Sequence, residues 1–387
     1  MGLLRWQRPL FWVAFVLALL GGAVAVLGSI DIWRVDPGKS VTAATSITAL
    51  NTPLTAAIAG WSTRSLLVDG RGDWLHSTGR LGRMVALGAL VPTLLALVVG
   101  LGAMATTIPL GPGEHLLPWL PGAVVALLFS SLSGGVVGAG VALLWRHPLA
   151  PVVTMVALWT ATAFATDGFV EVFATGGGLG EGVGRQYSSE IVTIRAVVAA
   201  LLAGCVLLMA WAATSGPTIL LRLSGLAPLV VLLTVGTAVS DVQEIVSDPS
   251  AEASECAGLE PVVCVLPGHE RYLPSAQDAA GNLYALDLPV EREAVMIITE
   301  LPPGRIQEIF DSAEPRPLTS RLSTLWIEGS GRVSIAASWA SPPECGMAVP
   351  SPQALASQTP RARVINWIAT GKGDRPSAED VEDAFTC

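Results

Sequence analysis

Long runs of apolar residues occupy the first 240 positions of the chain and are absent beyond them. A transmembrane helix needs roughly 20 mostly apolar residues, and seven segments come near or above that length. They are residues 9–30, 41–61, 84–107, 117–145, 151–166, 191–213 and 219–240. Two of them are weaker, because 41–61 is rich in threonine and 151–166 is short. The pattern predicts a mainly α polytopic membrane protein with six to seven transmembrane helices.

Residues beyond 240 show shorter apolar segments separated by polar turns. Residues 241–255 are acidic and read as a linker between a transmembrane domain (1–240) and a soluble domain (256–387). Expected strands are 262–266, 294–299, 323–327 and 332–338, and expected helices are 269–286, 305–311, 353–370 and 378–385. Such a mixture predicts a small C-terminal α/β or α+β domain.

Charge divides the chain at the same point. Residues 1–240 contain 21 charged side chains with a net charge of +3, whereas residues 241–387 contain 32 with a net charge of −12. This distribution excludes a single soluble enzyme domain and global disorder. It also predicts no nucleic-acid partner, because an acidic domain repels phosphates.

Basic residues orient the predicted spans, since cytoplasmic loops carry an excess of Lys and Arg. With the N-terminus inside, eight basic residues fall on the inner side and four on the outer side. Seven spans then leave the C-terminal domain outside, and a miscount of one span would reverse that location. With 20 Arg and only 2 Lys, the composition suggests a bacterial source. We therefore expect a multi-pass protein of the bacterial cytoplasmic membrane with a cytoplasmic N-terminus and an extracytoplasmic C-terminal domain.

Four of the five cysteines lie in the acidic part: Cys256, Cys264, Cys345 and Cys387. An even number of cysteines confined to one domain suits an oxidising compartment. Three pairings are possible, and we favour Cys256–Cys264, which closes a short loop, with Cys345–Cys387. The alternative is four free thiols in a cytosolic domain.

No catalytic motif stands out. Gly38-Lys39-Ser40 ends like a phosphate-binding loop, but Trp33 occupies the position of its first glycine. The four histidines are widely separated and do not show the spacing of a multi-histidine metal site. We expect no enzymatic activity in this chain, no directly bound cofactor and no metal site.

Hydroxyl side chains form a stripe along the second predicted span. Thr45, Thr48, Thr52 and Thr55 recur at helical spacing, and Asn51 lies among them. Because hydroxyls are costly against lipid, the stripe should face protein or a pathway. It could line the route of a substrate, or its hydroxyls could bond to their own or a neighbouring helix.

Span four contains a Gly-x-x-x-Gly pair, Gly134 and Gly138, which permits close approach between helices. The pair could be a dimer seam or could pack within one chain.

The longest predicted inner loop, residues 61–83, contains four arginines. Its candidate coupling residues are Arg64, Arg71, Asp73, Trp74, Arg80 and Arg83. The segment could form an amphipathic helix against the membrane or a partner, or its arginines could serve topology alone.

This layout resembles a type-2 ATP-binding-cassette (ABC) exporter permease. That family places a cytoplasmic coupling helix between spans two and three, matched here by residues 61–83, and an outer re-entrant element matched by residues 167–189. The stretch 256–270, CAGLEPVVCVLPGHE, is similar to the start of a C-terminal domain on some bacterial permeases of this type. The resemblance implies export, a cytoplasmic ABC ATPase partner that supplies ATP hydrolysis, and a homodimer or a heterodimer with a sister permease in the lipid bilayer.

The alternative function is a membrane-anchored extracytoplasmic sensor or binding protein. Seven spans are more than an anchor needs, which favours the permease. A membrane-embedded enzyme is disfavoured by the shortage of histidines and of carboxylates within the spans.

Overall fold

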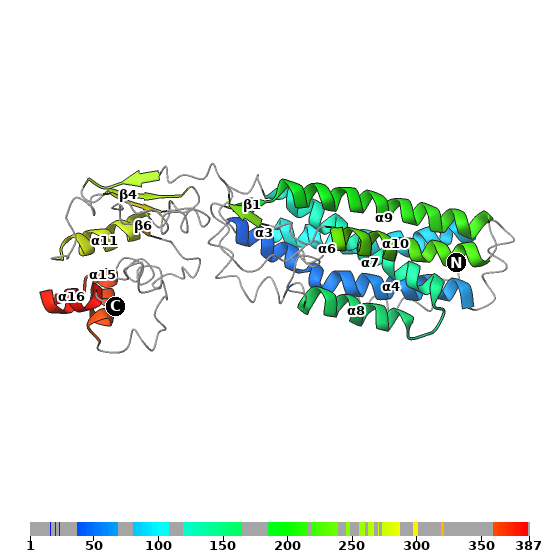
Figure 1. Cartoon of the computed structure of the whole chain (residues 1–387), viewed down its shortest axis with the longest axis horizontal. Helices are drawn as coiled ribbons and strands as arrows, with labels where there is room; N and C mark the ends of the chain where they lie inside the picture. The colour runs from blue at the N-terminus through cyan, green and yellow to red at the C-terminus, as the bar shows by residue number, and fades with distance from the viewer. Residues whose placement is uncertain are drawn as a thin grey trace.

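The computed structural model in Figure 1 shows a helical bundle followed by a C-terminal part that contains the strands β3–β6. The described residues are 37–68, 80–107, 119–164, 185–215, 218–238, 245–247, 255–259, 262–266, 273–286, 297–300, 319–320 and 359–385, with Val16, Leu20, Ala23 and Glu270. Apart from three positions, the predicted first span lies outside them. The expected helix at 305–311 and strands at 323–327 and 332–338 also lie outside.

The bundle follows the apolar segments of the sequence closely. Its helices are α3 (Pro37–Ser46), α4 (Thr48–Val68), α6 (Leu81–Thr107), α7 (Leu120–Leu144), α8 (Ala150–Phe164), α9 (Ser189–Ser215) and α10 (Thr218–Ala238). From α6 onward, each boundary lies within three residues of the prediction. The second predicted span differs, because a turn at Ile47 divides it into α3 and α4, and α4 continues to Val68.

Four helices among the described residues are long and apolar enough to cross a membrane: α6, α7, α9 and α10. This composition indicates a membrane protein. The helix α8 is apolar but shorter, and α4 is long but rich in threonine and serine. Large apolar side chains are exposed on α6, α8, α9 and α10, as expected for helices that face lipid.

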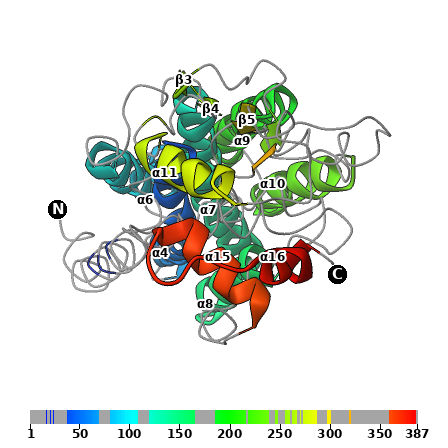
Figure 2. The ribbon, with the colours of Figure 1, turned by 90° about the vertical axis from the view of Figure 1, so that its left-hand side faces the viewer.

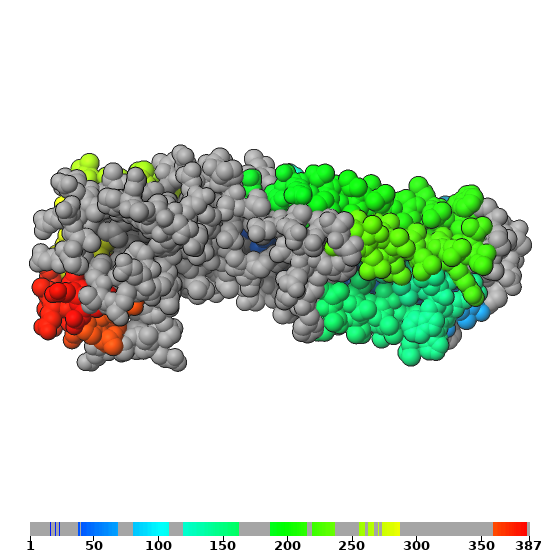
Figure 3. Space-filling view, viewed as in Figure 1, coloured from blue at the N-terminus to red at the C-terminus, as the bar shows by residue number. Residues whose placement is uncertain are grey.

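Helix α7 lies at the centre of the bundle. It is the most buried of the four apolar helices and contacts α4, α6, α8, α9 and α10. Figure 2, viewed along the bundle, shows these helices around it. In Figure 3, α8, α9 and α10 form much of the visible bundle surface.

Glycines allow this central position by bringing backbones into contact. A Cβ atom added at Gly138 would lie 2.1 Å from the Ala56 carbonyl oxygen of α4. One added at Gly135 would lie 2.1 Å from Thr93 Oγ1 of α6, and one at Gly140 would lie 2.7 Å from the Gly225 carbonyl oxygen of α10. Three faces of α7 therefore depend on the absence of a side chain.

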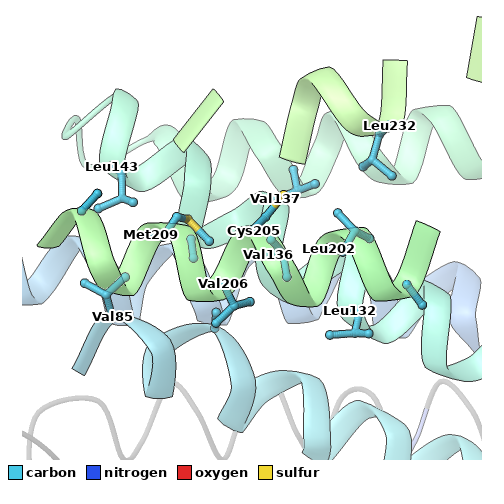
Figure 4. Packing of buried hydrophobic residues seen from close by; sticks show 14 of the residues in the cluster. Val85, Leu132, Val136, Val137, Leu143, Leu202, Cys205, Val206, Met209 and Leu232 are labelled. Carbon is cyan, nitrogen blue, oxygen red and sulfur yellow. The ribbon is translucent and has the colours of Figure 1, made fainter. Parts of the chain in front are cut away.

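Apolar side chains fill the space between α6, α7, α9 and α10. Figure 4 shows Val85 of α6, Val136 of α7, Leu202 and Met209 of α9 and Leu232 of α10 in one cluster. When such side chains are buried between helices, contacts with lipid tails are replaced by closer contacts with protein atoms. Tight packing, and not the exclusion of water, therefore stabilises the cluster.

A short strand pair closes one end of the bundle. Strand β1 (Arg185–Tyr187), which precedes α9, pairs antiparallel with β2 (Ile245–Ser247), which follows α10. Tyr187 also meets Trp119 edge to face, with ring centroids 5.3 Å apart. The start of α7, the start of α9 and the chain beyond α10 therefore lie at the same end.

The C-terminal part contains a four-stranded sheet of order β3-β4-β5-β6. Its strands are β3 (Glu255–Ala257), β4 (Val262–Val265), β5 (Ile297–Glu300) and β6 (Thr319–Ser320), and its helices are α11 (Leu273–Tyr284), α15 (Pro360–Thr370) and α16 (Ala378–Phe385). The first strand pair is antiparallel and the other two are parallel. A separate hydrophobic cluster joins β4 to the three helices.

Helix termini in this part follow their sequence signals. Thr359 accepts a hydrogen bond from the Ala362 amide at the start of α15, and Gly371 ends that helix with a φ of 63°. At α16, the Ser377 hydroxyl and the Asp380 carboxylate cap each other's backbone amides. The hydrogen bonds from Ser377 and the nearby Arg363 guanidinium lower the pKa of Asp380.

Replacing Gly138 with alanine should destabilise the bundle by about 1–3 kcal/mol, because the new methyl group meets backbone that cannot move aside. Gly204 is the matched control, because it lies in α9 with open space at its Cβ position. Gly204→Ala should be neutral or stabilising by up to about 1 kcal/mol. Thermal unfolding of both variants in detergent measures the difference, and equal melting temperatures would contradict the close contact between α7 and α4.

Candidate functional site

The predicted pathway stripe lies inside the bundle. Its five residues, Thr45, Thr48, Asn51, Thr52 and Thr55, are each at most 6 % exposed. They belong to α3 and α4, and α4 packs against α6, α7 and α8. These polar groups are therefore buried against protein.

Two of the hydroxyls bond to backbone carbonyl oxygens three residues earlier, and one of these bonds crosses the turn between α3 and α4. Thr45 Oγ1 donates to the Thr42 carbonyl oxygen at 3.1 Å, and Thr48 Oγ1 donates to the Thr45 carbonyl oxygen at 2.7 Å. Asn51 differs, because its buried Oδ1 has no hydrogen-bond partner within the described part of the chain. A buried amide oxygen of this kind can accept a hydrogen bond from a polar ligand or a water molecule.

The Gly134–Gly138 pair packs within one chain. A Cβ atom added at Gly134 would lie 2.5 Å from the Thr52 carbonyl oxygen and 3.2 Å from Thr55 Cβ, both in α4. Both glycines are buried, so this face of α7 is occupied by α4 and is not open to a second chain. The same contact places the middle of the pathway stripe directly against α7.

The predicted coupling segment is only partly a loop. Residues 61–68 form the last two turns of α4, so Arg64 is a helical residue, and Arg83 lies in the first turn of α6. Arg80 and Arg83 are exposed, whereas Arg64 is half-buried. Arg71, Asp73 and Trp74 lie outside the described residues. The prediction placed the loop too early because Trp61–Val68 mixes polar and apolar residues, although such residues also suit a half-buried helix.

Arginines gather at the end of the bundle opposite β1. This end contains the last turn of α4, the start of α6, the α7–α8 turn and the start of α10. Its arginines are Arg64, Arg80, Arg83, Arg146 and Arg222. Glu190, at the other end, is the one carboxylate in the described part of the bundle. The positive charge of this end is therefore not neutralised by described bundle residues.

Two polar features of the interior were not predicted as site residues. Arg195 of α9 is completely buried, on the same helix face as Ile191 and Val198. Ser130, Ser131 and Ser133 of α7 are also buried, and Thr93 Oγ1 lies 3.3 Å from the Ser131 carbonyl oxygen, which links α6 to α7. The spacing of Ile191, Arg195 and Val198 could have indicated an inward-facing arginine, because these residues share one helical face.

The cysteines of the C-terminal part form one observed disulfide, between Cys256 of β3 and Cys264 of β4. The two residues are direct cross-strand partners, with Cα atoms 4.1 Å apart. The pairing therefore agrees with the favoured one. Cys345 and Cys387 lie outside the described residues, and Cys205 is a free, buried cysteine of α9.

Thiol labelling checks this disulfide. Protein denatured with an alkylating reagent but no reductant should retain an unlabelled Cys256–Cys264 link, while Cys205 is fully labelled and serves as the internal control. Peptide mass spectrometry reads both. Labelled Cys256 and Cys264 in the unreduced sample would show that the bond does not form.

The described residues thus offer a buried polar helix and an unneutralised basic end. They contain no group of three or more His, Cys, Asp or Glu residues that could hold a metal ion. Comparison with protein-family models, curated proteins and solved structures found no match.

Proposed function

We propose that this chain is the membrane-spanning permease subunit of an ABC transporter, in which it works as an exporter powered by a separate ATPase subunit. The observation that carries the proposal is the arrangement of α4. This helix joins the basic end of the bundle to a buried polar stripe deep between apolar helices. A permease needs such an element, because ATPase movement at one membrane face must reach a polar route within the membrane.

The proposal counts α4 and α8 among the spans, together with the four apolar helices and the predicted helix at 9–30. Although α4 is polar, it is surrounded by protein, which removes the cost of exposing hydroxyls to lipid. Helix α8 lies beside α4, and a Cβ atom added at Gly60 would lie 3.3 Å from Pro151 of α8. Spans two and five are therefore neighbours, as a route between them requires.

The proposed orientation places the basic end in the cytoplasm and the C-terminal part outside. Two observations support it. Arginines predominate at cytoplasmic ends of membrane spans, and the Cys256–Cys264 disulfide belongs to the part of the chain beyond the opposite end. Disulfides persist in extracytoplasmic compartments and are rare in the cytosol of mesophiles. In this arrangement, the C-terminal part gates or selects the substrate on the outer side.

Coupling to the ATPase follows from the packing of α4. The exposed Arg80 and Arg83, with Arg71, offer cations to an acidic partner surface. Glycine contacts with α7 leave few protruding side chains between the two helices. In this proposal, displacement of the α4–α6 connection by the ATPase moves α4 as a rigid helix. The functional unit is a homodimer or a heterodimer with a sister permease, and ATP is bound by the partner ATPase.

Reversing the charge of Arg71 and Arg80 together, with Arg71→Glu and Arg80→Glu, should abolish co-purification of the ATPase. Close like charges at an interface cost several kcal/mol, so we expect a loss of at least tenfold in the recovered partner. The measurement is a mild-detergent pull-down of the tagged chain from its native host, quantified by mass spectrometry.

The matched control reverses two cations away from the basic end, with Arg185→Glu in β1 and Lys372→Glu in the C-terminal part, and should retain the ATPase. Recovery of a stoichiometric ATPase with the unaltered chain and its loss only in the first variant supports the coupling segment. Recovery of a kinase or another regulator in place of an ATPase would overturn the permease and favour a membrane-anchored sensor.

A further inference from the structure

Two arginines that are far apart in the sequence meet at the basic end. Arg64 Nε in the last turns of α4 donates to the Arg146 carbonyl oxygen in the α7–α8 turn at 3.0 Å. Both residues are half-buried between helix ends. The hydrogen bond holds the Arg64 guanidinium against the backbone of Arg146, so two arginine residues belong to the same corner of the bundle.

Neither arginine forms a salt bridge with a described residue, and the described bundle has no carboxylate at this end. The Nε atom of Arg146 is buried and has no hydrogen-bond partner among the described residues. The positive end of the α8 macrodipole also lies here, since α8 begins at Ala150. A partly desolvated pair of cations beside a helix N-terminus favours an anion with several acceptor oxygens, such as a phosphate group.

The same turn continues into an apolar surface. Trp145 is 45 % exposed and stacks on His147, with ring centroids 5.5 Å apart. Leu149, Val153 and Val156 are exposed at helical spacing along α8. Tryptophans are enriched where membrane headgroups meet acyl chains. The turn therefore carries both cationic residues and the start of an apolar stripe that continues along α8, a combination that suits the membrane interface.

We propose that Arg64 and Arg146 bind the phosphate of an anionic phospholipid whose acyl chain lies along the Leu149–Val153–Val156 face of α8. A free phosphate would satisfy the cations alone, whereas a lipid also covers the apolar stripe. Basic sites between transmembrane helices bind lipid headgroups in this way. This site is separate from the proposed ATPase contact, which uses the exposed Arg80 and Arg83 together with Arg71.

Native mass spectrometry of the full chain in detergent, titrated with phosphatidylglycerol, tests the proposal. The unaltered protein should retain one tightly bound phosphatidylglycerol and should bind phosphatidylcholine more weakly. Each surface arginine contributes roughly 1 kcal/mol to the attraction of anionic lipid, so Arg64→Gln or Arg146→Gln should weaken retention about fivefold. Arg64→Lys keeps the positive charge and should weaken it less.

Arg83→Gln is the matched control, because it removes an equally positive but exposed arginine from α6, and it should leave this lipid bound. A Leu149→Ser and Val153→Ser variant should weaken retention of the lipid while leaving the cations intact. Melting temperatures in phosphatidylcholine alone verify that every variant folds. Equal phosphatidylglycerol binding by all variants would overturn the proposal, as would displacement of the lipid by inorganic phosphate at the same concentration.

Discussion

The contact between α7 and α4 is the constraint on which the bundle depends. Gly134 and Gly138 place the backbone of α7 directly against Thr52 and Ala56, closer than any side chain would permit. Within a membrane there is no water to drive helices together, so the contact relies on dispersion between closely fitted surfaces. Gly135 and Gly140 extend the same arrangement to α6 and α10, which makes α7 the shared partner of the surrounding helices.

This constraint explains how a threonine-rich helix can exist within an apolar bundle. Alone in lipid, α4 would expose hydroxyl groups along its length, whereas here they face protein or bond to carbonyl oxygens of their own chain. The hydroxyl bonds of Thr45 and Thr48 run along the chain of α3 and α4, whereas the Arg64–Arg146 hydrogen bond attaches the end of α4 to the α7–α8 turn. Burial against protein therefore allows a polar helix among apolar ones, as the proposed transport function requires.

The two ends of the bundle are held together by different kinds of interaction. At one end, β1–β2 pairing and the Trp119–Tyr187 contact join the chain by backbone and aromatic interactions. At the other end, helix termini meet through arginines, of which Arg64 bonds to a carbonyl oxygen and forms no salt bridge with a described residue. The proposed lipid site lies at the arginine end, and the β1–β2 pair joins the other end to the chain that follows.

The apolar helices from α6 to α10 could be predicted from the residue pattern alone, because hydrophobic length in a membrane protein is a local property. The same holds for the favoured Cys256–Cys264 pairing and for the extent of α16, where capping residues are close together in the chain. Helix packing was needed to show that the Gly134–Gly138 pair faces α4, that α4 continues to Val68, and that Arg195 points inward. It also brought Arg64 to Arg146. Each of these contacts depends on which helices become neighbours. Helix periodicity in the sequence shows which residues share a face, but it does not show which helix packs against that face.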